Sequence, residues 1–324
     1  MTSPLVSAYI PAYNAEPYLA EAIRSVLDQT LGDIELIAVN DGSTDGTPGI
    51  IQAMAKADPR VRVIDQANQG VCVASNNAIR AARSNLIARM DADDVSLPDR
   101  LEKQYRYMTE HPDCLVLSGA VLNADLALCP IEPSRPPLDH HAIEAGLFSG
   151  VVGTLCNGCS MLRRDAFLEV GGFNPAYARA EELDLFLRMA ERGRLANLPD
   201  TLYIVRHHLQ SMSRSETLQT LRDLKYTILR ETCERRGIDP ESIEMAHPGG
   251  VLETYQVHIG WSSRALASGY RRTALRHALL AVGRGPLRRG AWGVLLGAVC
   301  GRRIMHAVRG AVRSVMGKSG GAAS

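Results

Sequence analysis

The sequence predicts an α/β protein in which a mixed, mainly parallel sheet is flanked by helices and followed by a C-terminal helical extension. Over the first 120 residues, short apolar runs alternate with amphipathic stretches, the pattern of strands alternating with helices. Polar clusters follow several of the apolar runs, and from residue 215 onward only helical patterns remain. Crossovers between such strands are right-handed and favour parallel pairing. We therefore divide the chain into a first region, residues 1–215, and a second region, residues 216–324.

The elements of the first region follow from apolar periodicity and turn residues. Leu19, Ile23 and Val26 form one helical stripe, and Thr47-Pro48 is an N-cap followed by proline in the first turn. Residues 130–137 are rich in proline and predict a surface connection. We expect strands at residues 5–10, 34–39, 61–64, 86–90, 114–120, 160–163 and 201–205, and helices at residues 18–29, 47–57, 71–82, 99–111 and 181–192.

Charge is distributed unevenly along the 324 residues, although the net charge is only +1. Apolar residues make up 46% and charged residues 22%, which allows a sizeable core and argues against global disorder. The last acidic residue is Glu253, and residues 254–324 contain twelve Lys and Arg, which leaves 24 basic and 35 acidic residues before them. The two parts of the chain are therefore expected to meet different partners.

The seven cysteines are odd in number and lie mostly among apolar residues, which indicates reduced thiols in a cytosolic chain. Cys156 and Cys159 form a lone CxxC, and a zinc site would need a second pair that the sequence lacks. The pair is either a redox centre or two small core residues that flank a turn, and the second interpretation is favoured.

Three polar clusters each follow a predicted strand: residues 11–14, 41–43 and 91–93. Ligands of open α/β sheets bind at the carboxyl ends of the strands. We therefore expect the three clusters to lie on one rim of the sheet.

Asp91, Asp93 and Asp94 place three carboxylates within four residues at a strand end. Carboxylate oxygens are ligands that Mg²⁺ and Mn²⁺ prefer, and water and substrate phosphate complete the shell of such ions. The alternative is a solvated acidic turn that caps the next helix.

Other polar groups leave similar alternatives open. Asp41 either caps its turn or accepts a hydrogen bond from a nucleoside. Gly70, after Asn68, either begins a helix or lets the backbone approach a phosphate. Arg206 and His208 follow a strand, so they belong either to a basic surface loop or to a site in which arginine meets phosphate and histidine ligates a metal.

Three acids open the predicted helix at residues 181–192. Glu181, Glu182 and Asp184 lie in its first turn, where the helix dipole favours negative charge. The functional interpretation is that one of them is a general base.

The order of these motifs resembles that of glycosyltransferase family 2, over roughly residues 3–213. The ordered set is more specific than any single member. The matching segments are residues 11–14 (PAYN), 25–30 (SVLDQT), 39–45 (VNDGSTD), 68–70 (NQG), Asn76, 90–94 (MDADD), 171–173 (GGF), 181–185 (EELDL) and 206–208 (RHH), with Ser211 and Ser213.

The resemblance implies a GT-A fold and an inverting, metal-dependent transfer from a nucleotide sugar, with UDP as the default nucleotide and Mn²⁺ or Mg²⁺ as cofactor. Residue by residue, it implies that Pro11, Tyr13 and Asp41 hold the nucleoside and that Asn68, Gly70 and Arg206 line the donor site. Asp91 would face ribose or diphosphate, and Asp93 would bind the metal with Asp91 and His208.

The family usually has Glu-Asp where this chain has Glu181-Glu182, and the second acid is the expected base. Glu182 is therefore the first candidate, followed by Glu181 and then Asp184. Ser75 departs from the pattern too, because many relatives have arginine there.

The resemblance implies a catalytic domain at residues 1–215 that builds a surface polysaccharide or a lipid-linked glycan. One alternative is a nucleotidyltransferase, but residues 11–17 lack the glycine-rich basic loop that this chemistry favours. The other alternative is a non-catalytic partner that keeps the fold.

The basic second region, residues 216–324, predicts a peripheral protein on the cytoplasmic face of a membrane. Basic amphipathic helices bind in the surface of anionic membranes. The alternative for this region is that its helices pack on the first region as ordinary helices. No signal peptide is evident, and residues 291–300, the longest apolar stretch of the tail, are about half as long as a spanning helix. No aromatic platform supports binding to nucleic acid.

Overall fold

The fold was analysed in a computed structural model, which describes residues 3–150, 153–209, 218–242 and 253–301. The chain forms two compact units. The first comprises the described parts of residues 1–122, 134–206 and 212–249, and the second those of residues 123–133, 207–211 and 250–324.

A mixed sheet organises the first unit, with strand order β3-β2-β1-β4-β8-β6-β9-β5 and β7 paired with β6. The pairs β1–β2, β2–β3 and β1–β4 are parallel, whereas β4–β8, β6–β8 and β5–β9 are antiparallel. The strands are β1 (Val6–Ala12), β2 (Ile34–Asp41), β3 (Val61–Gln66), β4 (Leu86–Arg89), β5 (Val95–Ser96), β6 (Cys114–Asp125), β7 (Pro130–Pro133), β8 (Met161–Arg163) and β9 (Arg194–His207).

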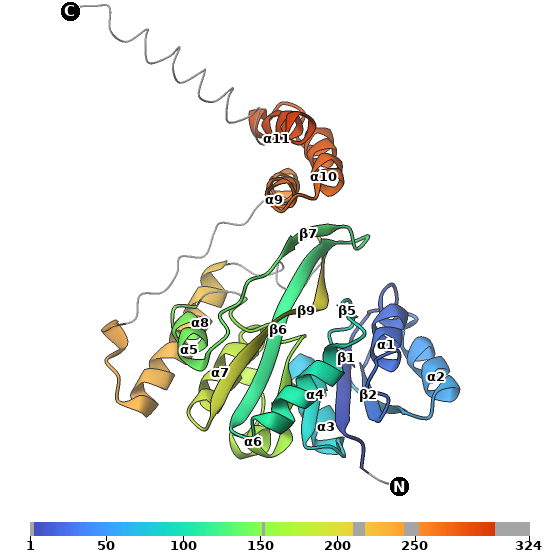
Figure 1. The fold of residues 1–324 in the computed structure, drawn as a ribbon, viewed down its shortest axis with the longest axis vertical. Helices are drawn as coiled ribbons and strands as arrows, with labels where there is room; N and C mark the ends of the chain where they lie inside the picture. The colour runs from blue at the N-terminus through green and yellow to red at the C-terminus, as the bar shows by residue number, and fades with distance from the viewer. Residues whose placement is uncertain (1–2, 151–152, 210–217, 243–252, 302–324) are drawn as a thin grey trace, which may run out of the picture. The chain divides into compact units, whose positions relative to one another are not determined.

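Helices cover both faces of this sheet (Figure 1). Residues of α1, α2 and α4 pack on one face, and residues of α3, α5, α6, α7 and α8 pack on the other. Their bounds are α1 (Leu19–Leu27), α2 (Thr47–Ala57), α3 (Val71–Ala81), α4 (Arg100–Glu110), α5 (His140–Phe148), α6 (Arg164–Glu169), α7 (Glu181–Ala190) and α8 (Leu218–Arg236), with short 3₁₀ turns at Pro175–Tyr177 and Pro240–Ser242.

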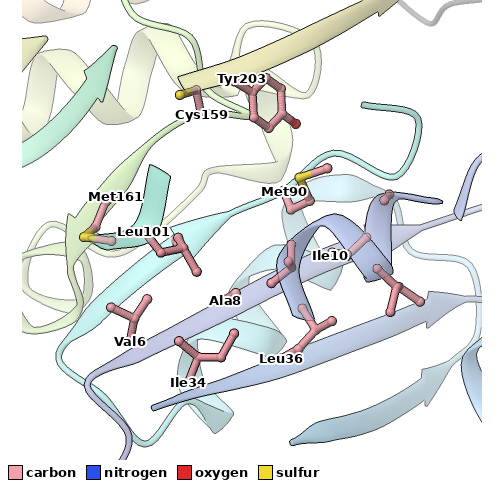
Figure 2. Close-up of a cluster of buried hydrophobic side chains, with 14 of the residues drawn as sticks. Val6, Ala8, Ile10, Ile34, Leu36, Met90, Leu101, Cys159, Met161 and Tyr203 are labelled. Carbon is pink, nitrogen blue, oxygen red and sulfur yellow. The ribbon is translucent and has the colours of Figure 1, made fainter. Parts of the chain in front are cut away.

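The core has one part on each face of β1, because successive side chains of a strand point to opposite faces of its sheet. Val6, Ala8 and Ile10 pack with Leu36 of β2 on the face that α1 covers (Figure 2). Tyr9 lies on the opposite face with the residues of α3 and α7. Every one of these side chains is almost fully buried, so β1 is the centre of the first unit.

Three helices form most of the second unit: α9 (Thr254–Ala267), α10 (Arg271–Arg284) and α11 (Arg289–Cys300). Figure 1 shows them packed together in orange and red. Small residues at the contacts, among them Ala265, Ala274 and Ala298, let the helices approach closely. Strand β7 packs against α9 through buried Ile131.

Most predicted elements are present, but the prediction for residues 130–137 was wrong in part. Residues 130–133 form β7, whose buried Ile131 supplies the reason for a strand there. Proline is tolerated because β7 lies at an edge, where β6 is its one partner within the described strands. Helices α5 and α6 were not expected, and β9 is longer than the predicted strand at residues 201–205.

The two compact units also divide the chain differently from the regions expected from the sequence. Helix α8 belongs to the first unit, where Tyr177 donates a hydrogen bond of 2.5 Å to Glu231 and Arg236 pairs with Glu144 at 2.6 Å.

None of the helices in the described ranges is both long enough and apolar enough to cross a membrane.

Candidate active site

The carboxyl ends of β1, β2 and β4 lie side by side, as predicted for the three polar clusters. Ala12 of β1 is in register with Asn40 of β2, and the backbone N–H of Met90 donates to the Tyr9 carbonyl at 2.9 Å. Asn14 joins the first two loops, because its carboxamide oxygen accepts from the Thr44 N–H at 2.9 Å. The rim is therefore one continuous surface, with partly buried Pro11 and half-exposed Tyr13 at the end of β1.

Asp41 is buried, and both of its carboxylate oxygens accept hydrogen bonds from the protein. Oδ1 accepts from Gln66 Nε2 at 2.8 Å and from the Gln69 N–H at 2.9 Å, and Oδ2 accepts from the Gly70 N–H at 2.8 Å. Asp41 thus holds the loop of residues 68–70 in place from behind.

That loop leads into the N-terminus of α3. Gly70 has φ 86°, a conformation that glycine adopts without strain. Gly42 packs so closely on the loop that a Cβ there would lie 2.6 Å from the Asn68 nitrogen. Asn68 is exposed, and the first turn of α3 has no side-chain cap, so its N–H groups and the helix dipole suit an anion.

Asp91 is held from three sides at the end of β4. Its Oδ1 accepts from Arg89 Nε at 2.8 Å, and its N–H donates to the Tyr203 hydroxyl oxygen at 3.0 Å. On the third side, a Cβ on Gly158 would lie 2.6 Å from Asp91 Oδ2. The carboxylate is fixed in direction yet remains 33% exposed.

Asp94 and Arg206 form the base of the acidic turn. Burial, followed by the charges of Asp93 and Asp91, raises the pKa of Asp94 well above its usual range. Arg206 donates from its backbone N–H to Asp94 Oδ1 at 2.8 Å and from Nε to the Asp93 carbonyl at 2.7 Å, and it also pairs with Glu21. Arg206 thus supports the turn, whereas the sequence suggested a phosphate contact.

Asp91 and Asp93, both partly exposed, fit a divalent cation of the magnesium type. Such an ion takes one or two carboxylates and otherwise water and phosphate oxygens. Within the described residues, no group of three or more His, Cys, Asp or Glu side chains is arranged to hold a metal. The third predicted ligand, His208, belongs to the second compact unit.

The three acids that open α7 differ in their surroundings. The carboxylate of Asp184 is buried and paired with Arg188, which also donates to the Gly172 carbonyl at 2.8 Å. Glu181 is buried and accepts from the Arg179 N–H at 2.8 Å. Among the described residues, no side chain or N–H outside its own residue is bonded to the carboxylate of Glu182, so Glu182 is the acid best placed to take a proton.

Burial, with the charge of Glu181 second, raises the pKa of Glu182 to about 7. The charges of Arg89 and Lys225 oppose this shift. A carboxylate with a pKa near neutrality is an efficient proton acceptor at physiological pH.

Arg89 is the site residue that the sequence analysis missed. It is buried, and its charge acts on Asp91, Glu181 and Glu182, so it connects the acidic turn with the start of α7. Its guanidinium lies 5.8 Å from the ring centre of Phe173. A lone arginine inside the apolar run at residues 86–90 was the signal that was available.

Two further sequence observations have structural outcomes. Ser75, at the position where many relatives have arginine, is fully buried on α3, so that position carries no charge toward the rim. Cys156 and Cys159 flank the turn that contains Gly158; burial raises the pKa of both thiols, which disfavours the reactive thiolate. Ser211 and Ser213 lie outside the described residues.

Comparisons with known proteins agree on one family. A model of the family described as glycosyl transferase family 2 matches residues 7–171. The chain is 31% identical over 280 residues to an uncharacterized glycosyltransferase of Haemophilus influenzae, covering 82% of this chain and 84% of that protein. It is 30% identical over 247 residues to a chondroitin synthase of Escherichia coli, covering 72% of this chain but only 33% of the synthase.

Solved structures with the same fold come from two other organisms. The mannosyltransferase PcManGT of Pyrobaculum calidifontis, in complex with GDP-Man and Mn²⁺, matches with a TM-score of 0.54 at 18% identity, covering 95% of this chain and 87% of that one. TarS 1–349 of S. aureus, in complex with UDP-GlcNAc, matches with a TM-score of 0.55 at 17% identity, covering 92% of each chain. At such identities the likeness concerns the fold.

Proposed function

The chain belongs to glycosyl transferase family 2 and has the GT-A fold, and from this premise we propose that it transfers a sugar from a nucleoside diphosphate sugar to an acceptor hydroxyl with inversion at the anomeric carbon. The observation that carries the proposal is the chemical environment of Glu182. It is a carboxylate without a hydrogen-bond partner among the described side chains, its pKa is raised to about 7, and Arg89 links it electrostatically to Asp91.

Glu182 acts as the general base in this proposal. Inversion in one displacement requires the acceptor oxygen to attack the anomeric carbon on the face opposite the leaving group, the geometry that also governs inverting hydrolysis. Glu182 accepts the proton of the acceptor hydroxyl as the new C–O bond forms, and the nucleoside diphosphate departs with the electrons of the broken C–O bond. Paired Asp184 and hydrogen-bonded Glu181 are less suited to this role.

The donor lies along the rim in this proposal. Asp91 and Asp93 would hold Mn²⁺ or Mg²⁺, which when bound neutralises negative charge on the diphosphate. The uncapped first turn of α3 offers N–H groups to the same diphosphate. Pro11 and Tyr13 would contact the nucleoside, while Asp41 acts by holding the Asn68–Gly70 loop; UDP remains the default nucleotide.

We further propose an acceptor in the synthesis of a surface polysaccharide or a lipid-linked glycan, on the cytoplasmic face of the membrane. Support for the class of product comes from relatives named chondroitin synthase and hyaluronan synthase. The chain matches about a third of the first synthase and a quarter of the second, so their full reactions are not carried over.

Donor hydrolysis tests the proposal without knowledge of the acceptor. The purified chain is incubated with Mn²⁺ and a panel of UDP-, GDP- and dTDP-sugars, and release of the nucleoside diphosphate is measured. We expect hydrolysis of one donor, together with a donor-dependent rise in melting temperature. Asp93→Ala should abolish both effects, and Glu182→Gln should lower hydrolysis by about 10²-fold or more while keeping the thermal shift.

Glu169→Gln is the matched control, because Glu169 is an exposed glutamate at the end of α6. Hydrolysis that survives Glu182→Gln would remove the base from the mechanism. A thermal shift with no turnover of any donor would favour the non-catalytic alternative. Release of inorganic pyrophosphate from a nucleoside triphosphate and a sugar phosphate would favour a nucleotidyltransferase.

A further inference from the structure

Helix α11 presents an apolar stripe to the outside of the second unit. Trp292, Leu296 and Val299 follow one another at four and three residues, so they share one face of the helix. They are 53%, 50% and 51% exposed. Helix α11 packs against α9 and α10, and Ala291 and Ala298, beside the stripe, are fully buried.

The apolar stripe continues beyond α11. Leu287, in the turn that precedes the helix, is 95% exposed, and Leu279 of α10 is 56% exposed. The indole N–H of Trp292 donates to the Pro286 carbonyl at 2.7 Å, so the polar group of this side chain is satisfied and its ring edge remains available. Tryptophan in this state suits the boundary between water and lipid.

Arginine side chains lie at both ends of the apolar stripe. Arg284, Arg288 and Arg289 are exposed near the N-terminal end of α11. At the other end, Arg271 donates to the Ala298 carbonyl at 3.1 Å and to the Val299 carbonyl. The charge therefore lies next to the apolar residues on both sides.

The arginines of this unit are only partly neutralised. Described residues 254–301 contain seven arginines and no acid. Arg264 pairs with Glu132 at 2.5 Å and Arg276 with Asp125 at 2.8 Å. Within the described chain, the other five arginines have no acidic partner.

We propose that the α11 face, defined by Leu287, Trp292, Leu296 and Val299 with Arg284, Arg288 and Arg289, docks on the surface of an anionic lipid bilayer. Exposed apolar side chains enter the boundary of the acyl chains while arginines meet the lipid phosphates. The helix lies on the bilayer, because its 12 residues span about 18 Å of a hydrocarbon core of about 30 Å.

Charge argues against the other occupants of this face. A symmetric dimer through α11 would place the arginines of one copy against those of the other. Residues 302–324 contain four Arg, one Lys and no acid, so this segment brings charge of the same sign. Phosphate-rich lipid is the complementary surface.

Co-flotation of the full chain with vesicles tests the proposal independently of transferase activity. One vesicle preparation contains phosphatidylglycerol and phosphatidylcholine at 3:7, and the other contains phosphatidylcholine alone. We expect at least tenfold more bound protein on the anionic vesicles at 0.1 M salt and a marked loss at 0.5 M salt. Trp292→Ser with Leu296→Ser should lower binding at least tenfold.

The matched control is Leu138→Ser with Tyr226→Ser. These side chains are 47% and 51% exposed but belong to the first unit, so binding should be unchanged. Arg284→Gln with Arg288→Gln and Arg289→Gln should remove the preference for anionic lipid. Melting curves establish that each variant is folded.

Several results would overturn the proposal. Equal binding by the wild type and by the Trp292/Leu296 variant would show that another surface binds lipid. Flotation that disappears only when the chain is ended at Gly301 would assign it to the final segment. A concentration-dependent dimer that the same variant abolishes, without vesicle binding, would assign the face to a second copy.

Discussion

At the scale of single residues, the surroundings of Glu182 make a prediction about pH. Its pKa is raised to about 7, first by burial and then by the charge of Glu181. A general base works only when deprotonated, so kcat/KM should rise with pH and level off above a midpoint near 7. Initial rates of donor hydrolysis between pH 5 and 9 measure this, and a rate that is flat across the range would contradict the role.

The same shift has a consequence for stability. A carboxyl group whose pKa is raised in the folded state binds its proton more tightly there than in the unfolded chain, so ionisation destabilises the fold. The loss develops between the ordinary pKa near 4.5 and the folded pKa of about 7. Glu182→Gln should therefore raise the free energy of unfolding at pH 8, by about 1–3 kcal/mol, and leave it nearly unchanged at pH 4.

The sequence allowed the three acids of α7 to be found but not to be ranked by their contacts. Spacing placed Glu181, Glu182 and Asp184 in one turn, whereas their roles depend on partners elsewhere in the chain. Arg188 neutralises Asp184, and only the fold brings Arg89 near Glu182. The resemblance nevertheless selected Glu182, which the contacts favour.

At the scale of elements, the turn between Cys156 and Cys159 packs directly against the carboxylate of Asp91. A Cβ on Gly158 would lie 2.6 Å from Asp91 Oδ2 and 2.8 Å from the Tyr203 hydroxyl oxygen. Gly158→Ala should therefore push the carboxylate from its position and weaken Mn²⁺-dependent binding of the donor about tenfold. The expected cost to folding is only about 1–3 kcal/mol, because one methyl group is added.

Isothermal titration with Mn²⁺ and the donor identified by hydrolysis measures this effect. Gly49→Ala is the control, because a Cβ at Gly49 of α2 meets no atom within 4 Å. If Gly158→Ala binds the donor as tightly as Gly49→Ala does, the turn does not position Asp91.

Elements with strong periodicity were predicted well, and elements defined by distant partners were not. Strand β1 and helix α3 carry their own apolar patterns, so their bounds differ by only one or two residues from the expected ones. Strand β7 is short and contains two prolines, and Ile131 is buried together with residues of α9 and α10. The local sequence pattern therefore does not predict this strand.

At the scale of the whole molecule, a buried chain of polar side chains within the second unit links α9 and α10 to the segment of residues 123–133. His258 and His277 meet through their Nδ1 atoms at 3.1 Å, and His277 Nε2 lies 3.1 Å from Asp125 Oδ2. Burial by itself would raise the pKa of Asp125, but hydrogen bonds from His277 and the Cys129 N–H, with the charge of Arg276, lower it overall.

Asp125→Asn should therefore destabilise the second unit. A lowered pKa stabilises the fold above the ordinary pKa of aspartate, and this contribution is lost as pH falls through the folded pKa. We expect a loss of about 2–4 kcal/mol at pH 7 and a difference between variant and wild type that shrinks as pH falls below the ordinary pKa of aspartate. Hydrogen exchange of the α9 and α10 amides measures the loss.

The control is Glu132→Gln, which removes a partly exposed partner of Arg264 in the same unit. Because an exposed ion pair contributes little, this variant should exchange much as the wild type does. Equal protection in both variants would mean that Asp125 does not anchor the helices. Charge asymmetry in the sequence indicated a separate basic region, but the pairing of Asp125 with residues about 150 positions later could not be read from it.

Asn76 of α3 pairs through its side chain with the backbone of Phe173. Its carboxamide donates to the Phe173 carbonyl at 2.8 Å and accepts from the Phe173 N–H at 3.0 Å, imitating one peptide unit of a sheet. A Cβ on Gly172 would lie 2.8 Å from the same carboxamide oxygen. The side chain of Asn76 and the backbone of Phe173, 97 positions apart, therefore form one contact that also depends on Gly172. We therefore expect Asn76 and Gly172 to be kept or replaced together in related sequences, whatever the length of the chain between them.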